Sequence, residues 1–134
     1  MDTMTTREYQ ELIKWKKPSK YRNIKTEVDG ITFDSRREAR DYMRLKHLQE
    51  HGFITNLELQ PKFPIVINNI KICVVILDFA FTALKPFELK AKKTSYPCIT
   101  GQKAYLDSKG KDTSLSRLKR KLVKACHGVE VWIT

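Results

Sequence analysis

Residues 74–81 read VVILDFAF, an apolar run interrupted by one carboxylate, Asp78. A run of this density predicts a strand that is buried on both faces, as part of a strand over residues 70–81. A buried carboxylate is costly unless it meets a metal ion or another cation. Residues 87–90 read FELK, and because side chains alternate along a strand, Glu88 and Lys90 leave the same face. If the two strands are neighbours, the two carboxylates and the lysine form a divalent-cation site with an amine beside it.

The composition favours a nucleic acid as the partner. The 134 residues fit a single domain, and 26 Lys and Arg residues against 15 Asp and Glu residues give a net charge of +11. Such an excess is typical of proteins that bind a polyanion, and a basic surface that only confers solubility is the alternative. Three widely spaced cysteines fit neither a disulfide framework nor a zinc site. With a polar N-terminus and no apolar run of membrane-spanning length, the sequence predicts a cytoplasmic protein with no membrane segment and no small-molecule cofactor.

Apolar periodicity and turn residues predict an α/β or α+β fold in which helices pack against a sheet. The predicted helices cover residues 5–17, 34–51 and 113–127, with a further helical turn at 102–106. The predicted strands cover a hairpin at 28–33, then residues 54–59, 63–67, 70–81, 87–91 and 129–133. Asp29-Gly30 and Asn68-Asn69 are expected to form the turns of two hairpins. The last helix has an apolar side, formed by Leu115, Leu118, Leu122 and Ala125.

The helix predicted over residues 34–51 has an apolar stripe that includes a carboxylate. The stripe is formed by Ala39, Tyr42, Met43, Leu45 and Leu48, and Glu38 falls inside it. One interpretation is the capping box Ser35-x-x-Glu38, in which Glu38 bonds to the Ser35 amide. The other is that Glu38 is a further acidic group facing a metal ion, and the sequence does not decide between the two.

Basic residues gather away from the apolar sides of the helices predicted over residues 34–51 and 113–127. The candidate phosphate-binding residues are Arg36, Arg37, Arg40 and Arg44 on the first, Arg117, Arg120, Lys121 and Lys124 on the second, and Lys92 and Lys93 after the FELK strand. Contacts between such residues and phosphates give salt-dependent binding with little sequence specificity. The alternative is that each face is an ordinary solvated helix surface.

The triplet Asp78, Glu88 and Lys90 suits phosphodiester hydrolysis. Mg²⁺ (or Mn²⁺) takes oxygen ligands and keeps several waters, so Asp78, Glu88 and the Leu89 carbonyl would suffice to hold it. Lys90 would orient the attacking water or stabilise developing charge. The alternative is that Asp78 is a turn residue at a strand end and that Glu88 and Lys90 are solvated residues of an edge strand.

Four segments carry a resemblance to a known family: KYRN at 20–23, FDSRREAR at 33–40, LELQPKF at 57–63 and LKRKL at 118–122. Over about residues 20–90 the chain resembles small phage-encoded endonuclease-like proteins of the PD-(D/E)xK superfamily, which includes Holliday junction resolvases. The resemblance implies a restriction-endonuclease-like core with a central mixed β-sheet flanked by helices. It also implies catalytic roles for Glu38, Asp78, Glu88 and Lys90. Leu77 stands where the superfamily has proline, and Ala91 where a glycine is expected after the lysine.

The resemblance therefore implies a Mg²⁺-dependent DNA endonuclease that acts on branched DNA as a homodimer, in a bacterial host's cytoplasm if it is phage-encoded. Residues 1–18 would form an N-terminal helix or arm, and residues 19–134 a single nuclease-like domain. The alternatives are a catalytically inactive, structure-specific DNA-binding protein and a phage factor that binds a host protein.

Overall fold

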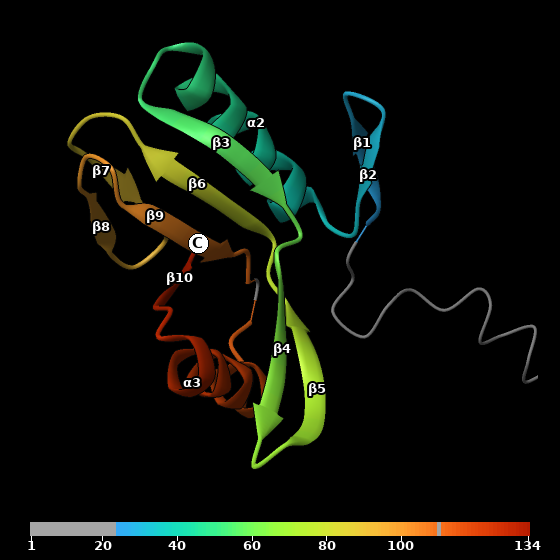
Figure 1. The fold of residues 1–134 in the computed structure, drawn as a ribbon. Coiled ribbons are helices and arrows are strands. Elements are labelled where there is room, and N and C mark those ends of the chain that lie inside the picture. The colour runs from blue at the N-terminus through green and yellow to red at the C-terminus, as the bar shows by residue number, and fades with distance from the viewer. Residues whose placement is uncertain (1–23, 110) are drawn as a thin grey trace, which may run out of the picture.

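The computed structural model describes residues 24–109 and 111–134, which form an α+β structure of two helices and ten strands (Figure 1). The predicted N-terminal helix lies outside the described residues. The main sheet is mixed and has the strand order β10-β9-β6-β3. Its strands are β3 (Ile54–Leu59), β6 (Phe79–Ala83), β9 (Lys103–Asp107) and β10 (Val131–Ile133). Only β9 and β10 are parallel; β6 runs antiparallel to both of its neighbours.

The first hairpin and helix form where the turn and capping residues place them. Strands β1 (Thr26–Val28) and β2 (Ile31–Phe33) are joined by Asp29 and Gly30, whose φ angles of 53° and 75° suit this turn. Helix α2 (Arg36–Glu50) begins after Ser35, whose hydroxyl accepts a hydrogen bond from the Glu38 amide. Both elements were predicted from sequence, and both predictions are confirmed.

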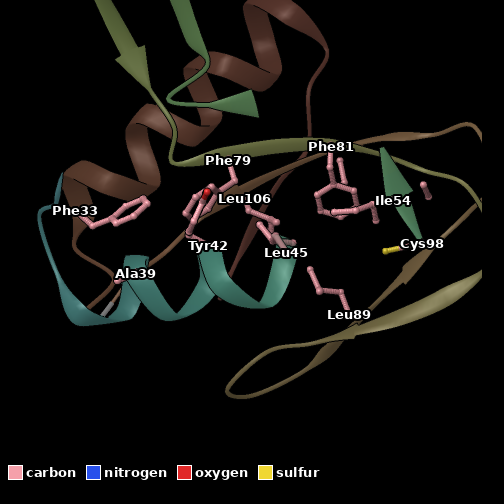
Figure 2. Packing of buried hydrophobic residues seen from close by; sticks show 12 residues of the cluster. Phe33, Ala39, Tyr42, Leu45, Ile54, Phe79, Phe81, Leu89, Cys98 and Leu106 are labelled. Atoms are coloured by element: carbon pink, nitrogen blue, oxygen red, sulfur yellow. The ribbon is translucent and has the colours of Figure 1, made fainter. Parts of the chain in front are cut away.

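The main hydrophobic core lies between α2 and the four-stranded sheet (Figure 2). Ala39, Tyr42 and Leu45 of α2 point toward Phe79 and Phe81 of β6. Leu45 and Phe81 are fully buried. The β7–β8 hairpin (Phe87–Lys90 and Ser95–Cys98) closes this core through Leu89 and Cys98. It is attached to β10 by Tyr96, whose ring stacks on Trp132 and whose hydroxyl bonds to the Ile133 backbone.

A second, smaller core lies between a long hairpin and the last helix. Strands β4 (Lys62–Ile67) and β5 (Ile70–Ile76) are joined by Asn68 and Asn69, as predicted. Phe63, Ile65 and Val75 of this hairpin pack against Val123 of α3 (Ser114–His127). In Figure 1 the hairpin projects beyond the main sheet alongside α3, with β4 between α3 and β5.

Four details differ from the sequence-based expectations. The strand predicted over 70–81 is two strands, β5 and β6, separated by Leu77 and Asp78; β6 is buried on both faces and β5 is not. Residues 102–106 are mostly strand β9 and not a helical turn, since Ala104 and Leu106 alternate into the core.

The other two differences concern the helices. Met43 is 47% exposed at the edge of the α2 stripe. On α3 the buried residue is Val123, whereas Leu115 and Leu118 are exposed, because only the C-terminal half of that helix packs against the hairpin.

The strand pairing also differs from the one that the predicted metal site requires. Asp78 precedes β6, and β6 pairs with β3 and β9. Strand β7, with Glu88 and Lys90, pairs with β8 in a separate two-stranded sheet. The connection from β6 to β7 is therefore not a hairpin within one sheet, and the expected adjacency of Asp78 to the FELK strand is wrong.

A pair of substitutions on α2 tests the packing. Leu45→Ala should lower the free energy of unfolding by about 2–5 kcal/mol, because it leaves a cavity in the core. Met43→Ala, on the exposed side of the same helix, should change it by less than about 1 kcal/mol. Urea denaturation followed by circular dichroism measures both, and equal losses would contradict the assignment of the buried face.

Candidate active site

Asp78 is held at the junction between the long hairpin and the main sheet. Its amide donates to the Leu106 carbonyl (3.1 Å), and its own carbonyl accepts from the Gln60 amide (2.9 Å). Its carboxylate oxygen Oδ2 accepts a hydrogen bond from the Ser108 amide at 2.7 Å. The Asp78 side chain is thus fixed against the end of β9, and it is largely buried there.

Asp107 is the nearest acidic neighbour of Asp78. Phe79 pairs with Leu106 in the antiparallel register of β6 and β9. Asp78 precedes Phe79 and Asp107 follows Leu106, so the same register sets Asp78 opposite Asp107. Burial, with a hydrogen bond to Asp107 and its negative charge, raises the pKa of Asp78 to about 8. Two carboxyl groups in this position share a proton or require a cation.

Glu38 approaches the same place from the first turn of α2. Burial is the main cause of its raised pKa, and the negative charges of Asp34 and Asp107 add to it. We call Glu38, Asp78 and Asp107 the acidic cluster. Within residues 24–109 and 111–134, no three His, Cys, Asp or Glu side chains lie close enough together to hold a metal ion as a preformed set. Asp78 and Asp107 are the closest pair, and Glu38 lies further off.

Lys109 completes the cluster with an amine. Its Nζ lies 3.3 Å from Asp107 Oδ2, and the side chains of Asp107 and Lys109 are 10% and 31% exposed. The Lys109 amide donates to the Thr134 carbonyl, and the Thr134 amide donates to the Asp107 carbonyl, so the backbone on both sides of Ser108 is held against the end of β10. Asp107 and Lys109 are two residues apart, the spacing that was expected of Glu88 and Lys90.

A buried polar network lies directly behind the acidic cluster. The hydroxyl groups of Ser108 and Thr134 both donate to Asp41 Oδ2. Ser108 also donates its amide to Asp78, so a chain of hydrogen bonds joins α2 to the acidic cluster through a single residue. This network fixes the direction of the loop that follows β9.

Basic side chains line an open pocket of about 530 Å³ on the other side of this network. We call it the basic pocket, and its walls are Arg37, Arg40, Asp41, Arg44, Lys90, Ala91, Lys92 and Thr134. Arg44 links the α2 side of the pocket to the Lys90–Lys92 side, because its Nη1 donates a hydrogen bond to the Lys90 carbonyl at 2.6 Å. Arg44 Nε is buried and has no hydrogen-bond partner among the described residues. Five cations against one carboxylate make the pocket suitable for an anion.

The structure separates the residues predicted from sequence into two groups. Glu38 and Asp78 lie in the acidic cluster, while Lys90 lines the basic pocket with the predicted DNA-binding residues Arg37, Arg40, Arg44 and Lys92. Glu88 is exposed and pairs across the hairpin with Pro97, and Leu89 is buried in the core. Arg36 and Lys93 are exposed.

The basic residues of α3 are less available than the sequence suggests. Arg120 forms a bidentate pair with Asp112 at 2.8 and 2.9 Å, and Arg117 also contacts Asp112. Lys124 pairs with Glu130 at 2.8 Å. Of the four predicted phosphate ligands on this helix, only Lys121 has no such acidic partner within the described residues.

Asp107 and Lys109 were not predicted from the sequence, although it carries a signal for them. Residues 106–110 read LDSKG, an acid-x-lysine triplet followed by the glycine that is missing after Lys90. The signal was hidden because residues 102–106 were assigned to a helical turn. A strand over 103–107 brings the triplet to the end of the sheet where Asp78 lies.

A family model described as "Protein of unknown function (DUF1064)" matches residues 18–133, which include the acidic cluster and every residue of the basic pocket except Thr134. The chain belongs to the DUF1064 family. No match was found among curated proteins or among solved structures. The described residues of this DUF1064 protein contain no helix that is long and apolar enough to cross a membrane.

The raised pKa of Asp78 predicts a stability effect in this DUF1064 protein. In the unfolded chain the carboxyl ionises near 3.8, whereas in the folded, metal-free protein it keeps its proton to about pH 8. The folded state therefore loses stability as pH rises through this interval. Asp78→Asn cannot ionise, so in EDTA its melting temperature should exceed that of the wild type near neutral pH, and the difference should shrink toward pH 4.

Asp112→Asn is the matched control for this effect. Arg120 lowers the pKa of Asp112, so this carboxylate stabilises the fold above its unfolded pKa, and its removal should lower the melting temperature at neutral pH. Scanning calorimetry over the pH series measures both variants. An Asp78→Asn protein that is no more stable than the wild type near pH 7 would contradict the described environment of the carboxyl.

Proposed function

We propose that this protein is a metal-dependent endodeoxyribonuclease with a restriction-endonuclease-like core. The observation that supports the proposal best is the position of Asp107 and Lys109 beside Asp78. The superfamily that the sequence resembles carries one acid on a strand and an acid-x-lysine triplet on the neighbouring strand. Asp78 next to β6 and the Asp107-Ser108-Lys109 triplet at the end of β9 fit this pattern, and β6 and β9 are paired neighbours.

The donor set suits Mg²⁺ or Mn²⁺. Asp78 and Asp107 offer carboxylate oxygens, and the Ser108 carbonyl stands where the middle residue of such a triplet supplies a third oxygen. Asp107 contributes to the raised pKa of Asp78, and a bound cation would relieve this repulsion, which supports a metal ion as a partner of the two carboxyl groups. When bound, the ion would neutralise the phosphate and lower the pKa of a water molecule.

Lys109 and Glu38 have separate roles in this proposal. Lys109, held by Asp107, would orient the attacking water or stabilise negative charge on the phosphate. Glu38 lies further from the two aspartates and would accept a proton or bind a water molecule. The bond from the Glu38 amide to the Ser35 hydroxyl does not involve the Glu38 carboxylate, which is the group that both the capping box and the acidic role would use.

The basic pocket would hold a DNA phosphate near the acidic cluster. Asp41 and Thr134 belong to both the pocket wall and the polar network that reaches Asp78 through Ser108. Arg37, Arg40 and Lys92 supply positive charge without a sequence-reading surface, which fits binding to DNA by its backbone and shape. We propose branched DNA as the substrate on the basis of the resemblance to junction resolvases.

Cleavage assays test the assignment of the catalytic residues. Purified protein with Mg²⁺ or Mn²⁺ should cut a synthetic four-way junction, and a flap and a linear duplex serve as comparison substrates. Asp107→Ala and Lys109→Ala should each lower the cleavage rate by at least about 100-fold, because each removes a group that stabilises the transition state.

Glu88→Ala is the matched control, since Glu88 is an exposed carboxylate of the triplet on β7. It should cut within about threefold of the wild type, a difference well below 1.4 kcal/mol in barrier height. Loss of cleavage in Glu88→Ala with retention in Asp107→Ala would reverse the assignment. Binding without cleavage of any substrate would favour a non-catalytic DNA-binding protein.

Salt-dependent binding tests the basic pocket separately from catalysis. With Ca²⁺ in place of Mg²⁺, Arg40→Ala should weaken junction binding and reduce the slope of log K against log salt by about 1. Lys124→Ala, which removes a cation already paired with Glu130, should change the slope by much less. Fluorescence anisotropy measures both, and equal effects would argue against the pocket as the main phosphate contact.

A further inference from the structure

The outer face of the β4–β5 hairpin is an apolar surface without a covering element among the described residues. Four aliphatic side chains on it are each 40–54% exposed: Val66, Ile72, Val74 and Ile76. The opposite face of the same hairpin packs against α3 through Phe63, Ile65 and Val75. A contiguous exposed apolar patch of this kind often marks an interaction site.

The two edges of the hairpin differ. On the β4 edge, α3 packs alongside, and His127 Nε2 donates to the Pro64 carbonyl at 2.7 Å. On the β5 edge, no backbone hydrogen bond joins β5 to any element other than β4 within residues 24–109 and 111–134. Pro64 pairs with Val74 and has no N–H, so the Val74 N–H and C=O point away from β4. The β5 edge therefore offers backbone donors and acceptors beside a row of aliphatic side chains.

We propose that a second copy of this chain pairs antiparallel with β5 across a twofold axis and covers this surface. The strand is self-complementary. A twofold axis at Val74 sets Ile72 opposite Ile76 and Val74 opposite itself, and one at Cys73 sets Ile72 opposite Val74. The segment of β5 that would pair carries no proline, and the one charged residue of β5, Lys71, pairs with Val66 beyond the β-bulge and lies outside the row of Ile72, Val74 and Ile76. The inference rests on the hairpin alone and does not depend on the proposed nuclease chemistry.

Other occupants fit this surface less well. The aliphatic row of β5 carries no cation, so it cannot neutralise DNA phosphates. Residues 1–23 of the same chain are the other candidate, but the sequence there predicts an amphipathic helix over residues 5–17 and not a strand that could satisfy the open edge. A second copy satisfies the backbone groups and the side chains together.

Sedimentation equilibrium of the full chain, together with hydrogen exchange of the β5 amides, tests the proposal. We expect a concentration-dependent dimer in which the Val74 amide is protected, and protection should fall as the protein is diluted. Val74→Lys should raise the dimer dissociation constant by at least about 100-fold, because the twofold axis brings two buried ammonium groups together. Ile72→Lys is a second variant on the same row with the same expectation.

Ile99→Lys is the matched control, since Ile99 is 61% exposed but lies away from the hairpin, between β8 and β9. It should leave the dimer unchanged, and circular dichroism melting should show that all three variants fold. A full chain that stays monomeric at every concentration would overturn the proposal, as would a Val74→Lys variant that still dimerises. Protection of the β5 amides that does not change on dilution would assign the surface to a segment of the same chain.

Discussion

The antiparallel register between β6 and β9 is the constraint on which the candidate site depends. Phe79 opposite Leu106 sets Asp78 against Asp107, and the same register directs the Ser108 amide to the Asp78 carboxylate. Phe79 and Leu106 are each 1% exposed, so a shift of one residue would turn both out of the core. The packing of the main core thus determines which two carboxyl groups meet. The unfavourable proximity of the two acids is maintained by hydrophobic packing on the adjacent residues.

The sequence predicted local structure well wherever turn and capping residues mark the ends of an element. Asp29-Gly30, Asn68-Asn69 and the Ser35 cap each lie where the sequence placed them. Asp78 and Glu38 were predicted as candidate site residues because a carboxylate in an apolar pattern is conspicuous. Such signals act over a few residues, and the physical cause of each is visible in the sequence.

Long-range pairing was not predictable in this way. The FELK and LDSK segments both offer an acid and a lysine two residues apart, and local patterns do not say which strand lies beside Asp78. That choice depends on β7 pairing with β8 and on β9 entering the main sheet between β6 and β10. The exposed outer face of β5 was missed for a related reason: an apolar run appears the same in sequence whether one or both of its faces are covered.

The continuity of the long hairpin with the main sheet has a geometric consequence. Strands β3 and β6 continue as β4 and β5, and the two pairs are linked at the junction by the bonds from Gln60 to Asp78 and from Leu77 to Pro61. The hairpin is therefore a rigid spacer with Asp78 at its base. A twofold axis at Val74 or Cys73 would place the two copies of Asp78 eight or ten residues apart along the paired strands. At about 3.3 Å per residue, this is about 26–33 Å. That distance corresponds to about eight to ten base-pair steps of duplex DNA at about 3.4 Å each. In a dimer with the proposed nuclease activity, the length of β5 would therefore set the distance between the two cuts.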